Sequence, residues 1–137
     1  MDSKLQAISL ELRAMESGQA ASWLMSAYPV SSPEYGDVFQ LLKARPWKRA
    51  DQLRLARYYL QKIPFANAKP YEAFVAFMSL KLFISVLREF LPKPKADVDL
   101  LVYYLKSVLE KAAKTSDDRA AVNALLGDLL SAQLDSI

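Results

Sequence analysis

The sequence predicts an all-α protein, a compact bundle of six or seven helices, and three observations carry that prediction. Apolar residues recur at spacings of three and four along the chain, and no segment shows the alternation of a convincing strand. Glycine, which hairpin turns usually need, is scarce at three residues. A chain of 137 residues has the size of one domain, so we expect a single α-helical domain over residues 1–137.

The first third of the chain predicts three helices. Ser3 is a suitable N-cap for the first, whose apolar positions are Leu5, Ile8, Leu12 and Met15. Gly18 suits a stop or a kink, and a short helix over 19–27 follows it. The sequence Ser32-Pro33-Glu34 combines an N-cap, a first-turn proline and an acidic residue that favours the helix dipole. It predicts a third helix that ends near Ala44.

The middle of the chain predicts two longer helices. Pro46 ends the third helix and opens another, Trp47–Lys62. A second segment, about 69–91, is apolar on nearly every side, and such a helix either spans a membrane or lies at the centre of a helical protein. Charges at Glu72, Lys81 and Arg88 interrupt it too often for a span. We therefore expect it to be the central helix of the bundle.

The last third predicts two more helices. Pro92 and Pro94 make residues 91–95 a stiff extended connector. A helix over 96–114 follows, with an apolar stripe. Thr115 and Asp118 then resemble a capping box with Asp in place of Glu, which starts a final helix that ends near Leu134.

Charge is distributed unevenly. The formal net charge is +3, but residues 43–62 carry +6 and residues 63–95 carry +3, whereas residues 1–42 and 96–137 each carry −3. The middle of the chain is therefore basic and both ends are acidic.

The composition leaves few groups for catalysis. The chain has no Cys and no His, which excludes disulfides, thiolate nucleophiles and zinc clusters and removes the usual proton-transfer group. The close acidic pairs Asp97/Asp99 and Asp117/Asp118 stand at predicted helix starts, where they stabilise the dipole. We expect no enzyme activity, no catalytic residue, no metal site and no cofactor. Residues 1–17 lack the apolar stretch of a signal peptide, which favours a cytoplasmic location.

A basic and aromatic surface is the main functional candidate. On the helix 47–62, arginines, lysines and aromatic residues lie opposite the apolar arc, and such residues are enriched at binding hot spots. The predicted partner-binding residues are Trp47, Lys48, Arg54, Arg57, Tyr58, Lys62, Lys81 and Arg88.

The central segment contributes the last two of these residues. Lys81, Ser85 and Arg88 form one narrow polar stripe at 100° per residue. If this stripe joins the basic helix, the protein has one continuous basic face. If an acidic residue of the outer helices neutralises Lys81, the partner hypothesis loses half of its support.

With its short length, its expected cytoplasmic location and its lack of Cys, His and a catalytic motif, the chain resembles in overall profile the compact helical immunity and antitoxin proteins of bacteria. The resemblance implies a small soluble module that neutralises a toxin or an enzyme, one with an acidic surface, by occlusion. One alternative is a nucleic-acid-binding regulator that uses helix 47–62. Another is a helical-repeat-like adaptor or homodimeric scaffold, for which the Tyr-Tyr-Leu tripeptides at 58–60 and 103–105 are the slight internal echo.

Overall fold

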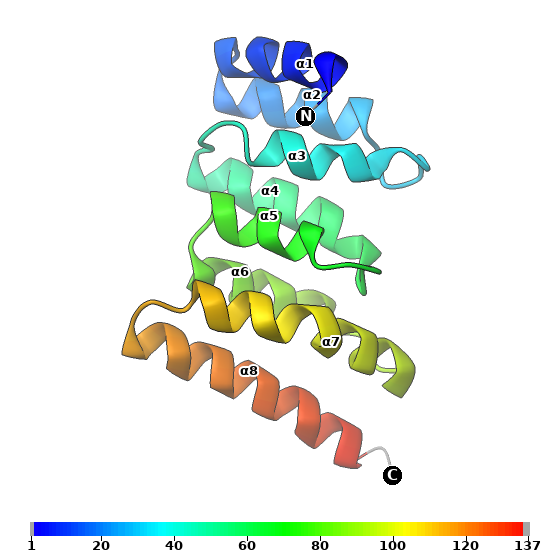
Figure 1. Ribbon diagram of the computed structural model, residues 1–137, viewed down its shortest axis with the longest axis vertical. Coiled ribbons are helices and arrows are strands. Elements are labelled where there is room, and N and C mark those ends of the chain that lie inside the picture. The colour runs from blue at the N-terminus through cyan, green and yellow to red at the C-terminus, as the bar shows by residue number, and fades with distance from the viewer. Residues whose placement is uncertain (1, 136–137) are drawn as a thin grey trace.

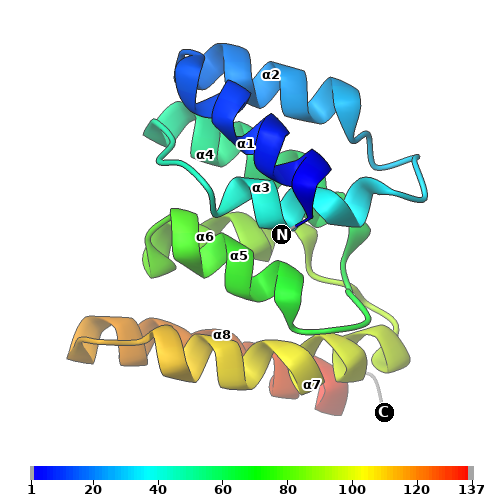
Figure 2. The ribbon, with the colours of Figure 1, turned by 45° about the horizontal axis from the view of Figure 1, so that its top comes forward.

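Each helix of the protein packs against the helix two positions away along the chain. The computed structural model describes the backbone of residues 2–135 and the side chains of residues 2–131. Within that range α1, α3, α5 and α7 follow one another in one row, and α2, α4, α6 and α8 follow one another in a second row. The views in Figure 1 and Figure 2 show the result, a stack of helix pairs that runs from the N-terminus to the C-terminus.

The all-α prediction is confirmed, with eight α-helices in the described part of the chain. Their bounds are α1 Ser3–Ala14, α2 Ser17–Ala27, α3 Val38–Leu42, α4 Arg49–Tyr59, α5 Lys69–Phe77, α6 Leu80–Leu87, α7 Lys95–Ala112 and α8 Ser116–Asp135. Short 3-10 turns precede α3 and follow α4 and α6, at Tyr35–Asp37, Leu60–Lys62 and Arg88–Phe90.

The prediction of one continuous helix over 69–91 is wrong. Its residues do lie in the middle of the stack, but they form two helices, one in each row. Met78 has extended backbone angles and ends α5, and the Ser79 side chain caps α6 by accepting a hydrogen bond of 3.2 Å from the amide of Leu82. The chain therefore turns where the apolar pattern continues without interruption.

Three other predicted boundaries shift. The sequence predicts that the third helix starts at Ser32-Pro33-Glu34, but a 3-10 turn over Tyr35–Asp37 comes first and α3 starts at Val38. Asp2, not Ser3, caps α1, because its carboxylate accepts a hydrogen bond of 2.9 Å from the amide of Leu5. Gly18 lies inside the first turn of α2 instead of ending a helix. The Thr115 cap is confirmed, since its hydroxyl accepts a hydrogen bond of 3.0 Å from the amide of Asp118.

Replacing Ser79 with Ala should lower the free energy of unfolding by about 1 kcal/mol, since α6 would lose its only side-chain cap. Chemical denaturation measures the change. Ser3→Ala is the matched control and should change stability by only a few tenths of a kcal/mol, because Asp2 makes the cap of α1. Equal effects of the two substitutions would contradict the assigned break between α5 and α6.

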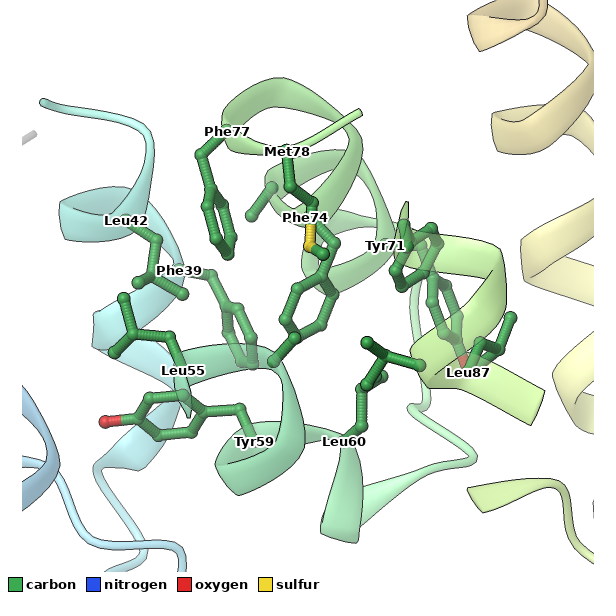
Figure 3. Packing of buried hydrophobic residues seen from close by; sticks show 14 of the residues in the cluster. Phe39, Leu42, Leu55, Tyr59, Leu60, Tyr71, Phe74, Phe77, Met78 and Leu87 are labelled. Carbon is green, nitrogen blue, oxygen red and sulfur yellow. The ribbon is translucent and has the colours of Figure 1, made fainter. Parts of the chain in front are cut away.

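Aromatic rings join the two rows at the centre of the core. Phe39 of α3 meets Phe74 of α5 at 5.9 Å and Tyr59 of α4 at 5.9 Å between ring centroids. Phe74 in turn stacks on Phe83 of α6 at 5.3 Å. Figure 3 shows Phe39, Tyr59 and Phe74 converging from three helices. The apolar residues of the central segment are thus core residues, as the sequence suggested.

The helix pairs recur at nearly regular intervals. The even-numbered helices begin at Ser17, Arg49, Leu80 and Ser116, so successive ones start 31 to 36 residues apart. The two Tyr-Tyr-Leu tripeptides do not mark equivalent positions, because one lies at the end of α4 and the other in α7, which belongs to the opposite row. The stack is therefore regular in architecture without a matching sequence repeat.

Candidate functional site

Two of the predicted contact residues, Lys48 and Arg54, contact α2 or its N-cap residue. The Lys48 ammonium lies 3.7 Å from the Glu16 carboxylate, which stands at the N-cap of α2. The Arg54 guanidinium lies 3.0 Å from Asp51 and donates a hydrogen bond of 2.8 Å to the hydroxyl of Ser22. Both predicted contact residues thus tie α4 to its neighbour in the same row.

Arg57 of α4 forms an ion pair with a residue that follows α6. Its guanidinium donates two hydrogen bonds of 3.1 Å to the two carboxylate oxygens of Glu89, which follows α6. This bidentate pair holds the pKa of Glu89 below its usual value and raises that of Arg57. The predicted hot-spot arginine therefore already holds a carboxylate of the same chain.

The polar stripe of α6 is neutralised in the same way. Lys81 lies 3.4 Å from the Asp117 carboxylate and Arg88 lies 2.8 Å from that of Asp128, both on α8. This is the arrangement that the sequence analysis named as removing half of the support for a basic partner face. The acidic charge of the last helix meets the basic charge of the middle of the chain.

The remaining predicted residues also have partners within the chain. Trp47 is buried, and its indole N–H donates to the carbonyl of Leu42 at 3.0 Å. The Tyr58 hydroxyl accepts a hydrogen bond of 3.0 Å from the amide of Val30. The Lys62 ammonium lies 5.1 Å from the centre of the Tyr35 ring. Tyr58 and Lys62 therefore both contact the segment between α2 and α3, to which Val30 and Tyr35 belong. Every one of the eight predicted residues therefore makes an intramolecular contact.

Asp51 is a buried structural residue, although its position in the sequence of α4 is opposite the apolar arc. Its side chain is only 8% exposed, because α2 covers that side of α4. Hydrogen bonds from Ser17 and Arg54 hold the pKa of its carboxyl below the usual value. The hydroxyl of Ser17 also accepts a hydrogen bond of 3.0 Å from the amide of Lys48, so these groups form one polar junction between α2 and α4.

A groove of about 540 Å³ lies between α3 and α5, two neighbouring helices of the odd-numbered row. Its apolar floor includes Phe39 and Phe65, whose ring centroids are 5.5 Å apart at 76°. Phe65 is fixed by the hydrogen bond of 3.0 Å that its amide donates to the Tyr71 hydroxyl, and burial raises the pKa of that phenol to about 12. The full lining is Tyr35, Gly36, Phe39, Gln40, Lys43, Phe65, Ala66, Asn67, Lys69, Pro70 and Glu72.

Two further hollows share lining residues with this groove. One of about 440 Å³ shares Lys43 with it and reaches Phe77 at the end of α5, and its lining also includes Gln52 of α4 and Trp47, which is one of the predicted contact residues. The other, of about 480 Å³, shares Glu72 with it and lies between α5 and α7, beside Lys111 and Lys114. We call the three hollows together the odd-row groove. No sequence pattern predicts this groove, because its walls come from helices far apart in the chain.

Three lysines of the odd-row groove have no acidic partner, unlike the basic residues of the predicted face that form ion pairs. Within residues 2–131, Lys43, Lys69 and Lys111 are exposed, and none of them forms an ion pair. Two other basic lining residues donate to backbone carbonyls, since the Arg45 guanidinium donates to Leu12 and Met15 and the Lys114 ammonium donates to Lys111. Exposed lysines without an acidic partner thus line the groove, although Arg49 of α4 and Arg119 of α8 on the even row are also exposed and form no ion pair within residues 2–131.

Two general features of the described residues complete the picture. No group of three or more acidic residues is arranged to hold a metal ion in that part of the chain. None of the helices placed there combines the length and the apolar character that crossing a bilayer requires.

The fold and the groove define a class of protein, an all-α stack of helix pairs with a lysine-rimmed, aromatic-floored groove along one row. Comparison of the chain with protein-family models, with curated proteins and with solved structures finds no match. Functional inference therefore depends on the surface itself.

Proposed function

We propose that the protein is a binding module that holds another protein, in the manner of an inhibitor or immunity protein, and that the odd-row groove is its contact surface. The observation that carries the proposal is the contrast between the groove and the predicted basic face. Lys48, Arg54, Arg57, Lys81 and Arg88 of that face form ion pairs within the chain, whereas Lys43, Lys69 and Lys111 rim an apolar groove without an acidic partner.

Stacked helix pairs suit this role because they present long continuous surfaces. An apolar floor supplies contact area that can be desolvated, and charges on the rim steer and orient a partner. The groove offers both, since Tyr35 and the exposed Ala66 lie beside the rings of Phe39 and Phe65 in its lining, and lysines stand directly after α3 and on α5 and α7. The row of helices would cover the part of the partner's surface that lies in the groove. An occluding inhibitor acts by covering a surface of its partner in this way.

The paired charges of the even row weaken the nucleic-acid alternative on helix 47–62. A phosphate backbone would have to compete with Glu16, Asp51 and Glu89 for Lys48, Arg54 and Arg57. Non-specific nucleic-acid affinity depends on the number of cations free to contact phosphates.

Affinity capture from the native host, with paired charge-reversal variants as baits, tests the proposal. Lys43→Glu/Lys111→Glu alters the groove, and Lys93→Glu/Lys106→Glu makes the same change in charge at exposed positions outside its lining. We expect a protein that binds the wild type and the second variant but is lost from the first, with a defined stoichiometry when the purified components are mixed. Equal retention by both variants would contradict the proposal, as would binding of random RNA or DNA in place of protein at low salt.

A further inference from the structure

We infer that the part of the odd-row groove between α3 and α5, the α3–α5 cavity, binds an extended acidic segment of the partner protein that inserts one large apolar side chain. This inference rests on the proposed function and adds the chemistry of the bound segment. The shape of the cavity, its floor, its rim and its one carboxylate each contribute to it.

The size and the floor of the cavity fit a bulky apolar side chain. Its volume of about 540 Å³ lies within the range of ligand-binding pockets, roughly 300–1,000 Å³. The rings of Tyr35, Phe39 and Phe65 already meet edge to face at the floor, at 6.1 Å and 5.5 Å between centroids. A further aromatic ring can extend such an edge-to-face arrangement.

The rim selects negative charge. Lys43 follows the last residue of α3 and Lys69 is the first residue of α5, so the two lysines stand on opposite walls. The N-terminal end of α5 also lies at the cavity, where its dipole adds to the positive potential. Acidic residues on both sides of the inserted side chain would meet one lysine on each wall.

Polar groups on the walls suit an extended main chain. Gln40 and Asn67 carry amides that can pair with peptide groups, although the Asn67 oxygen already accepts a hydrogen bond of 2.9 Å from the amide of Lys69. An extended segment leaves its own N–H and C=O groups free for such contacts. A helix would have satisfied them internally.

Glu72 argues for a peptide over a nucleic acid. It lies where the α3–α5 cavity meets the hollow between α5 and α7, and it forms no ion pair within residues 2–131. A uniformly charged phosphate backbone would be repelled there. A peptide can place a backbone N–H or a basic side chain opposite Glu72 and keep its acidic residues near the lysines.

Selection from a random 12-residue peptide display library on the full-length protein tests this inference. We expect enrichment of peptides in which aspartate or glutamate flanks one aromatic or large aliphatic residue. A fluorescently labelled synthetic peptide of the enriched sequence should then bind at least about tenfold more weakly to Lys43→Glu/Lys69→Glu, and its affinity should fall as salt is added.

Two further variants separate charge from shape. Ala66 is exposed at the cavity, so Ala66→Trp should fill the apolar part and weaken binding without a change of charge. Lys93→Glu/Lys106→Glu is the matched control and should leave the affinity within about twofold. Thermal unfolding of each variant confirms that it is folded.

Several results would overturn the inference. They are enrichment of neutral or basic peptides, no enrichment at all, insensitivity to Lys43→Glu/Lys69→Glu, and a concentration-dependent dimer that this variant abolishes. Because the capture experiment uses intact partners and alters Lys111 in place of Lys69, it can succeed when the peptide selection fails. The groove would then remain the contact surface, and only the acidic segment would be refuted.

Discussion

Replacing Phe39 with Ala should lower the free energy of unfolding by about 3–5 kcal/mol, a large part of the stability of a domain of this size. Phe39 is 5% exposed and meets four other rings edge to face, those of Tyr35, Tyr59, Phe65 and Phe74. These rings come from both rows of the stack and from the loop before α5. The substitution would therefore open a cavity at the point where three helices meet.

Urea denaturation, followed by circular dichroism, measures this loss. Leu10→Ala is the control, because Leu10 is 67% exposed on α1 and its truncation should change stability by less than about 0.5 kcal/mol. A loss below about 1 kcal/mol for Phe39→Ala would show that the aromatic cluster is not the centre of the core. The large expected loss of stability makes Phe39→Ala unsuitable for testing binding at the groove, even though this ring forms part of the floor.

The all-α fold was predictable because it depends on local signals. Apolar spacing, caps such as Thr115 and the prolines at 46, 92 and 94 act over a few residues of chain, and they placed most helices within a few residues of their observed bounds. The break at Met78 and Ser79 is different. No Gly or Pro marks it, and the apolar pattern runs through it because α5 and α6 are both buried on broad faces.

The position of the functional surface could not be read from charge along the chain. Helix by helix, the sequence correctly indicated a basic middle and acidic ends. Which carboxylate meets which cation, however, depends on the register between neighbouring helices of one row. Lys81 and Asp117 are 36 residues apart, and only the stacking of α8 on α6 brings them together.

Asp51 is a single residue whose burial, like the ion pairs, depends on how the helices stack. A helical wheel places it opposite the apolar arc of α4, which predicts exposure. An inner helix of a stack has a neighbour on each side of its own row, here α2 and α6, so the solvent-facing arc is narrower than for an isolated amphipathic helix. The polar junction between Asp51 and Ser17 lies in the part of the α4 surface that α2 covers.

Replacing Asp51 with Ala should lower the free energy of unfolding by about 2–3 kcal/mol at neutral pH, because the variant loses hydrogen bonds to a buried charged group. Asp51→Asn keeps the shape and should lose less. The folded-state pKa of Asp51 is lowered, so its ionised form contributes stability above the unfolded-state pKa of about 3.8. That contribution should disappear as the pH falls from about 4 through the folded-state value.

Denaturation curves for the wild type and Asp51→Asn, recorded between about pH 7 and pH 2, test the sign of this effect. The stability difference should be constant near neutral pH and should shrink below about pH 4, since protonation removes from the wild type the charge that the variant already lacks. Asp37→Asn is the matched control, since it makes the same chemical change at an exposed carboxylate and should change stability by less than about 0.5 kcal/mol. A difference that stayed constant down to pH 2 would mean that the Asp51 charge does not stabilise the junction between α2 and α4.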